Sequence, residues 1–193
     1  MIEFAKHHID MDRIAYVSQF VSKDPVRPVL HNLHVEKEGD DTIVTATDGR
    51  ILATVTLRTE LEPGLYKVLK CNKSTVWLDK LPDDIGTYPN WRAVVPKPEG
   101  KEFDVKDRRE LCYAAALMGC YIDFDNTMKM EITGKMYITD RESPILVVGD
   151  WHKSVVMPIR SDRDAVYKAE KYVEQYWREK ITKEMEPSAK EAA

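Results

Sequence analysis

Three short stretches, far apart in the chain, hold the residue types that bind another molecule without transforming it. Each combines a turn-forming residue with apolar side chains and an arginine: Thr47-Asp48-Gly49-Arg50-Ile51-Leu52, Tyr88-Pro89-Asn90-Trp91-Arg92-Ala93-Val94 and Val155-Val156-Met157-Pro158-Ile159-Arg160. None of the three carries catalytic chemistry. Because surface turns with apolar neighbours suit the capture of a side chain, together they predict a surface pocket that holds a peptide.

The rest of the sequence offers little catalytic chemistry. It contains no nucleophile–base pair, phosphate-binding loop or paired-carboxylate motif. Asp48 directly precedes a glycine, which favours a turn-capping role over that of a general base. We therefore expect a binding protein and not an enzyme.

The candidate metal ligands do not form a site either. His7 and His8 are neighbours in a predicted strand, so their side chains point to opposite faces and do not share one ion. Asp123, Asp125 and Asn126 lack the glycine and the distal glutamate of a calcium loop, which favours a polar turn. We expect no metal and no cofactor.

Two segments about a hundred residues apart share one pattern, which predicts the scaffold that positions the three stretches. Each begins with Glu-Phe, continues through an amphipathic stretch, and then shows a hairpin with a nearby glycine and a further strand. In the first segment these features are Glu3-Phe4, residues 10–21, strands 33–36 and 42–47, and Gly39. In the second they are Glu102-Phe103, residues 107–120, strands 128–131 and 135–140, and Gly134. The shared start and spacing favour a duplicated βαβββ unit over a chance match.

Apolar periodicity predicts which side chains of these elements face the core. In the first half they are Ile14, Val17, Val21, Leu33 and Val35, and in the second half Leu111, Ala115, Met118, Met128 and Met130.

The remaining segments connect or extend the two halves. Residues 65–69 and 75–78 are expected to add two strands, and the prolines and glycines of residues 82–100 mark a crossing loop. We expect one domain over residues 1–160, with halves at about 1–70 and 101–160, and a helical extension over 161–193. Its helix is expected from about 163 to 185, and its aromatic residues form a packing stripe more readily than a nucleic-acid platform: Tyr172, Tyr176 and Trp177.

Composition sets limits on function. The chain has 193 residues, of which 43% are hydrophobic, so a soluble protein with a hydrophobic core is expected. Its net charge is −4, so strong autonomous affinity for DNA is not expected. Contact limited to a basic patch remains compatible with that charge. Three cysteines without metal spacing indicate buried thiols in the cytoplasm: Cys71, Cys112 and Cys120. No apolar run has the roughly 18 residues of a membrane span, and the first residues do not look like a signal peptide.

Four motifs resemble the bacterial DNA polymerase III beta subunit, the β sliding clamp. They occur in the family's order: Arg27-Pro28-Val29-Leu30-His31-Asn32-Leu33, Ala46-Thr47-Asp48-Gly49-Arg50-Ile51-Leu52, Pro89-Asn90-Trp91-Arg92-Ala93-Val94 and Val156-Met157-Pro158-Ile159-Arg160. The resemblance covers roughly residues 1–160. It implies an α+β DNA clamp (processivity) fold, in which a domain consists of two βαβββ halves, with the sheets outside and the two helices facing the central hole and its DNA.

In that family the motif residues line a groove for short peptides of polymerases and other replication proteins. Carried over by motif, the groove is expected to use Leu30, Thr47, Gly49, Arg50, Leu52, Pro89, Ala93, Val94, Val156, Met157 and Pro158. An aliphatic floor of Leu52, Val94 and Met157 suits a Leu or Phe anchor, and Arg50 or Arg92 suits a polar flank of the peptide.

The resemblance also implies contact with double-stranded DNA through basic residues on or beside the two helices. These are Arg13, Lys23, Arg27, Lys106, Arg108 and Arg109. The alternative is a solvated helix face, because acidic residues are interleaved with them: Asp12, Asp24, Asp104, Asp107 and Glu110.

Two functions follow from the resemblance. The first is a replication accessory protein that self-assembles around DNA and tethers a DNA polymerase. The second is a binding module that occupies or mimics the clamp groove, as an adaptor or competitor, without encircling DNA. A family member has three such domains per chain and two chains close a ring, whereas this chain has sequence for one, so homo-oligomer formation decides between the two.

Overall fold

The computed structural model describes residues 1–117, 120, 122–123, 127, 129–130, 133–158, 171 and 174–175. Its longer elements, in chain order, are β1 (Ile2–Ala5), α1 (Met11–Ser18), β2 (Leu33–Glu38), β3 (Asp41–Thr47), β4 (Ile51–Leu57), β5 (Gly64–Cys71), β6 (Thr75–Lys80), β7 (Lys101–Val105), α2 (Arg108–Leu117), β8 (Gly134–Ile138), β9 (Ile145–Val148) and β10 (His152–Val156). Three short 3₁₀ helices join them: η1 (Pro28–His31), η2 (Asp83–Ile85) and η3 (Trp91–Val94).

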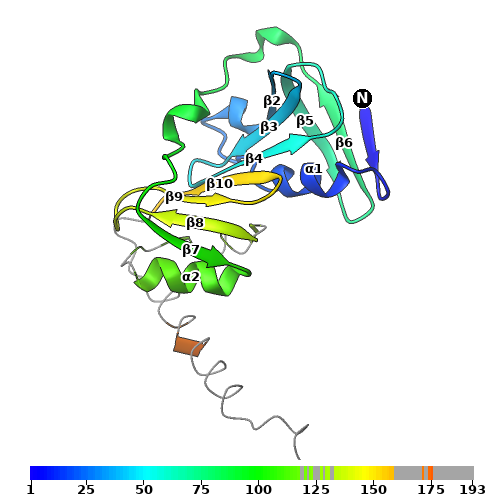
Figure 1. Ribbon diagram of the computed structural model, residues 1–193. Helices are drawn as coiled ribbons and strands as arrows, with labels where there is room; N and C mark the ends of the chain where they lie inside the picture. The colour runs from blue at the N-terminus through cyan, green and yellow to red at the C-terminus, as the bar shows by residue number, and fades with distance from the viewer. Residues whose placement is uncertain are drawn as a thin grey trace, which may run out of the picture.

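The strands form one antiparallel sheet in the order β1-β6-β5-β2-β3-β4-β10-β9-β8-β7 (Figure 1). The order contains two βαβββ units, β1-α1-β2-β3-β4 and β7-α2-β8-β9-β10, which confirms the predicted halves. They meet where β4 pairs with β10, with Ala53 opposite Ser154. The added strands β5 and β6 form a hairpin that lies between β1 and β2.

The hairpin predicted after the second helix, with strands over 128–131 and 135–140, is wrong in its first strand, whereas the second strand corresponds to β8. Gly134 is the first residue of β8, opposite Val105, and not part of a turn. Of the strand predicted over 128–131, Lys129 and Met130 are described and lie in a turn and a bend, while the other two residues lie outside the described part. β8 instead pairs with β7 on one side and with β9, the next strand in the chain, on the other. In the first half the predicted hairpin is confirmed, with Gly39 at φ 61° between β2 and β3.

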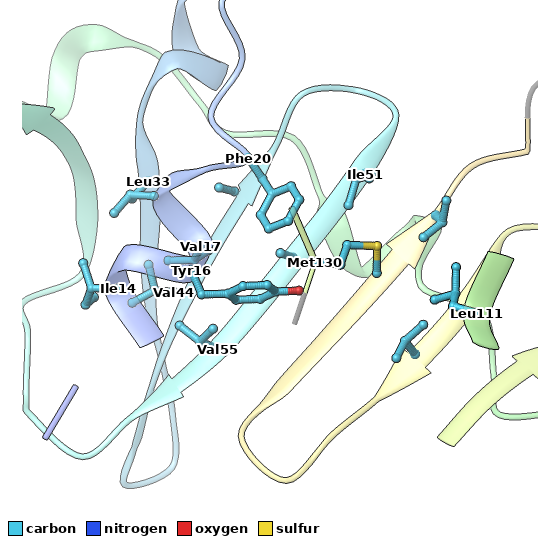
Figure 2. Close-up of a cluster of buried hydrophobic side chains, with 14 of the residues drawn as sticks. Ile14, Tyr16, Val17, Phe20, Leu33, Val44, Ile51, Val55, Leu111 and Met130 are labelled. Atoms are coloured by element: carbon cyan, nitrogen blue, oxygen red, sulfur yellow. The ribbon is translucent and has the colours of Figure 1, made fainter. Parts of the chain in front are cut away.

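Both helices pack against the same face of the sheet, which forms the main core. The predicted core residues of the first half, apart from the half-buried Val21, are buried there, and those of the second half that the structure describes are Leu111, Ala115 and Met130. Figure 2 shows Tyr16 and Phe20 beside β4, with Met130 and Leu111 on the side of the second half. Tyr16 also bonds across the junction, because its hydroxyl lies 2.7 Å from Ser154 Oγ of β10.

Acidic side chains accept backbone N–H groups at the start of each helix. Before α1, the buried Asp10 carboxylate accepts the N–H groups of Arg58 and Thr59, which holds the end of β4 beside the helix. Before α2, Asp107 accepts the N–H of Glu110 at 3.0 Å, and the Glu110 carboxylate accepts the N–H of Lys106 at 2.8 Å. These two bonds resemble a capping box, although Glu110 reaches the amide of the residue before Asp107, and they satisfy amides that lack helical partners.

The crossing segment, residues 81–100, covers the opposite face of the sheet. Leu52, Val155 and Leu146 form a row there, because Leu52 lies opposite Val155 and Val155 opposite Leu146. Trp91 and Val95 of the crossing segment pack on this row. Among the described residues no helix has both the length and the apolar character needed to cross a membrane. Of the predicted C-terminal extension, only Lys171, Glu174 and Gln175 are described, and these three are helical.

Candidate functional site

The turn between β3 and β4 is built by the first of the three stretches. Asp48 Oδ1 accepts the N–H groups of Arg50 and Ile51, each at 2.9 Å, so Asp48 caps the turn as predicted. Thr47 Oγ1 accepts the N–H of Gly49 at 3.0 Å and donates to the carbonyl of Ile51 at 2.8 Å. Gly49 has a φ of 89°, which favours glycine, and a Cβ there would lie 3.0 Å from the Arg27 side chain. Side-chain hydrogen bonds of Thr47 and Asp48 therefore hold the turn.

The third stretch lies beside this turn. Because β10 pairs with β4, Val156 stands opposite Ile51 and Val155 opposite Leu52. The chain continues past the strand, where the Met157 N–H donates to the Arg50 carbonyl at 2.9 Å. The end of β10 is thus bonded to the turn of the first stretch.

The second stretch forms η3 and is fastened to β2 by polar contacts. Trp91 Nε1 donates to Glu36 Oε2 at 2.6 Å, and Arg92 donates to Glu36 at 2.8 Å and to Glu38 at 3.1 Å. The Arg92 guanidinium also lies 4.2 Å from the Trp91 ring centroid. Burial raises the pKa of Glu36, but the bonds from Trp91 and Arg92 outweigh it and hold that pKa below its ordinary value.

The three stretches surround one hollow of about 250 Å³ on the face of the sheet opposite the two helices, which we call the outer face. It is lined by Arg27, Leu30, Thr47, Gly49, Arg50, Ile51, Leu52, Tyr88, Pro89, Asn90, Trp91, Val94, Val155 and Met157. We call this hollow the outer groove. Val94 and Met157 are the exposed apolar side chains of its rim, with exposed fractions of 48% and 39%.

Eight of the eleven residues predicted for a peptide groove line the outer groove, and three do not. Val156 is fully buried in the main core, because neighbouring residues of a strand face opposite sides, and Val155 takes its place. Ala93 and Pro158 are also absent from the lining.

The aromatic part of the lining was not predicted from the sequence. Tyr88 and Trp91 both stand in the second stretch, and the turn formers around them signalled a loop but not the direction of each ring. Tyr88 is buried, which raises the pKa of its hydroxyl, and its ring stacks on His34 with 4.7 Å between centroids. Both aromatic residues are therefore fixed parts of the wall.

The two arginines considered for a peptide flank differ in their partners and in their position relative to the groove. Arg92 is held by Glu36 and Glu38 and does not line the groove. Arg50 lines the groove with 67% of its side chain exposed, and it is paired with Asp123. Arg27, which was predicted to face DNA, is exposed and also lines the groove.

The other residues predicted to face DNA differ in how exposed their side chains are. The Arg13 guanidinium bonds to the Thr56 carbonyl, lies 3.8 Å from Asp10 and is mostly buried. Lys23 and Lys106 are exposed. Arg108 and Arg109 belong to α2, but their side chains lie outside the part that the structure describes.

Metal binding finds no support in the described residues, which contain no group of three His, Cys, Asp or Glu side chains suited to an ion. The His8 ring accepts the Asp10 N–H at 3.1 Å and lies 3.4 Å from Thr59 Oγ1, so it has a structural role. Asp123 pairs with Arg50, while Asp125 and Asn126 lie outside the described residues.

Comparison with solved structures identifies the architecture. The chain is similar to β sliding clamps from Thermotoga maritima, C. crescentus and Pseudomonas aeruginosa, with TM-scores of 0.58, 0.58 and 0.56 at 15%, 16% and 17% identity. Each match covers 83% of this chain and 65%, 65% and 66% of the respective clamp chain. No protein-family model and no curated protein matches the sequence. The chain therefore has the fold of the bacterial DNA polymerase III beta subunits and spans just under two thirds of the clamp chains that it matches.

Proposed function

We propose that the protein is a clamp-like replication accessory protein whose outer groove binds a short peptide of a DNA polymerase or another replication protein. The observation that carries this proposal is the meeting of three distant stretches around one apolar hollow on a clamp fold. The hollow has an aliphatic floor and rim, so it suits a Leu or Phe anchor, whose burial is worth on the order of 2 kcal/mol. In this role the protein binds and does not catalyse.

The side chains of the rim allow a clean test. Met157→Ala and Val94→Ala remove exposed apolar groups and leave the core untouched, whereas Leu52 packs on Val155 and Leu146 and contributes to the fold. We expect each rim variant to weaken binding of a labelled peptide carrying the clamp-binding motif by about tenfold. The measurement is fluorescence polarisation at fixed salt concentration.

Ile85→Ala is the matched control for this test. Ile85 is exposed to 42%, similar to the two rim residues, but it does not line the groove. Its affinity for the peptide is expected to equal that of the wild type. Unchanged affinity in both rim variants, or no measurable binding by the wild type, contradicts the proposed groove.

A second function, a binding module that does not encircle DNA, competes with the first. It is favoured by Arg13, whose guanidinium bonds to the Thr56 carbonyl and is mostly buried, which makes one of the six expected phosphate contacts less accessible. Arg27 is exposed and also lines the groove. Lys23 and Lys106 remain exposed for such contacts. The mass in solution and the retention on closed circular DNA separate the two functions. A monomer that is not retained on DNA excludes the ring, and peptide binding then supports the adaptor or competitor.

A further inference from the structure

Trp91 connects the two apolar clusters beside the outer groove. One cluster contains Leu30, Leu65 and Tyr88, the other Leu52, Leu146 and Val155, and Trp91 packs against both. Trp91 also lines the groove itself, and it begins η3, which ends at the rim residue Val94. The Trp91 ring therefore contacts both sides of the groove.

The placement of Trp91 depends on one carboxylate outside the groove. Within η3 the described bonds are weak, since Ala93 N–H donates to the Asn90 carbonyl at 3.2 Å and Val95 N–H to the Arg92 carbonyl at 3.3 Å. No side chain caps η3. The short bonds of this segment lead to Glu36, which accepts from the Trp91 indole at 2.6 Å and from Arg92 at 2.8 Å.

We propose that Glu36 of β2 is a positioning residue for the outer groove, which holds Trp91 and η3 in the shape that accepts the partner peptide. This inference rests on the proposed function. Glu36 does not line the groove, so it acts through Trp91 and Arg92 and not by contact with the peptide. A hydrogen bond to a charged group is stronger than a neutral one, which suits a single side chain that fixes a short helix.

Glu38 provides a matched control two residues further along β2. Its carboxylate bonds to Arg92 at 3.1 Å and is 66% exposed, whereas that of Glu36 is 28% exposed and also holds the indole. Loss of Glu38 thus removes one of the two bridges to Arg92 and leaves Trp91 in place. Loss of Glu36 removes the other bridge to Arg92 and also frees the Trp91 indole.

Amide hydrogen exchange tests the positioning without any peptide. In Glu36→Ala, exchange of the amides of Ala93 and Val95 is expected to accelerate about tenfold, and in Glu38→Ala less than twofold. Glu36→Gln keeps the shape of the side chain, and exchange of the same two amides is expected to accelerate by a smaller factor. Equal exchange in the wild type and in both Glu36 variants overturns the proposal.

A double-mutant cycle tests whether the positioning serves the groove. Glu36→Ala and Trp91→Phe, which lacks the indole N–H, are each expected to weaken peptide binding about tenfold, and the double variant no further. Additive losses, or unchanged affinity in Glu36→Ala together with faster exchange, contradict a role of Glu36 in the groove. A wild-type protein that does not bind the peptide refutes the proposed function instead, and the exchange data still decide whether Glu36 positions η3.

Discussion

Asp10 offers the sharpest test of how the fold is held together. Its carboxylate is fully buried and accepts the Arg58 N–H at 3.0 and 3.1 Å and the Thr59 N–H at 2.7 Å. Asp10→Ala removes the acceptor of both backbone donors. At roughly 1–3 kcal/mol for each unsatisfied group, we expect a loss of about 3 kcal/mol in the free energy of unfolding at pH 7.

The pH dependence follows from the sign of the pKa shift of Asp10. Burial raises this pKa, but the bonds from Arg58 and Thr59 and the charge of Arg13 outweigh it, so the net shift is downward. A lowered pKa in the folded state gives stability that is present above the unfolded value, about 3.9, and is lost as the pH falls through the folded value. The stability gap between the wild type and Asp10→Asn is therefore expected to narrow below about pH 4.

Urea unfolding followed by circular dichroism at pH 7 and at pH 3 measures both effects. Asp12→Asn is the control, because Asp12 is an exposed acid on the same helix and its loss is expected to change stability by less than about 0.5 kcal/mol. An Asp10→Asn variant as stable as the wild type at pH 7, or equally destabilised at both pH values, refutes this account of Asp10.

Two further predictions address the sheet. Tyr16→Phe removes the buried 2.7 Å bond to Ser154 that joins α1 to β10, and a loss of about 1 kcal/mol is expected in the same urea assay; an unchanged midpoint argues against the bond. Gly134→Ala places a Cβ 2.1 Å from the Val148 carbonyl oxygen at a φ of 155°, so we expect its thermal midpoint to fall by at least about 5 °C. Gly39 has open space around it, so the thermal midpoint of Gly39→Ala is expected to fall by less. Equal melting of these two glycine variants contradicts the close packing of β8 on β9.

Local patterns predicted the elements of the first half well. Alternation in Leu33 and Val35, and the helical spacing of Ile14 and Val17, report burial directly, because each side chain faces a core whose direction the backbone period fixes. The turn-capping role of Asp48 was also predictable, since it depends on residues only two and three positions away.

Long-range pairing escaped the sequence analysis. No local pattern places the β5–β6 hairpin between β1 and β2, or pairs β8 with β7, because these choices depend on strands distant in the chain. Within the groove, the motif predicted Val156. Neighbouring residues of a strand face opposite sides of the sheet, and here Val155 faces the groove while Val156 faces the core. Trp91 was visible as an aromatic residue, but its contact with Glu36 joins residues 55 positions apart.

The pairing of β4 with β10 has a consequence for how the chain reaches its native state. β4 is almost wholly buried and carries an unbroken row of aliphatic and threonine side chains, Ile51 to Leu57. Until β10 is synthesised, about a hundred residues later, β4 is an unpaired edge of the kind that recruits strands from other chains. The first half expressed alone is therefore prone to aggregate, and the second half acts as the cover that ends this exposure.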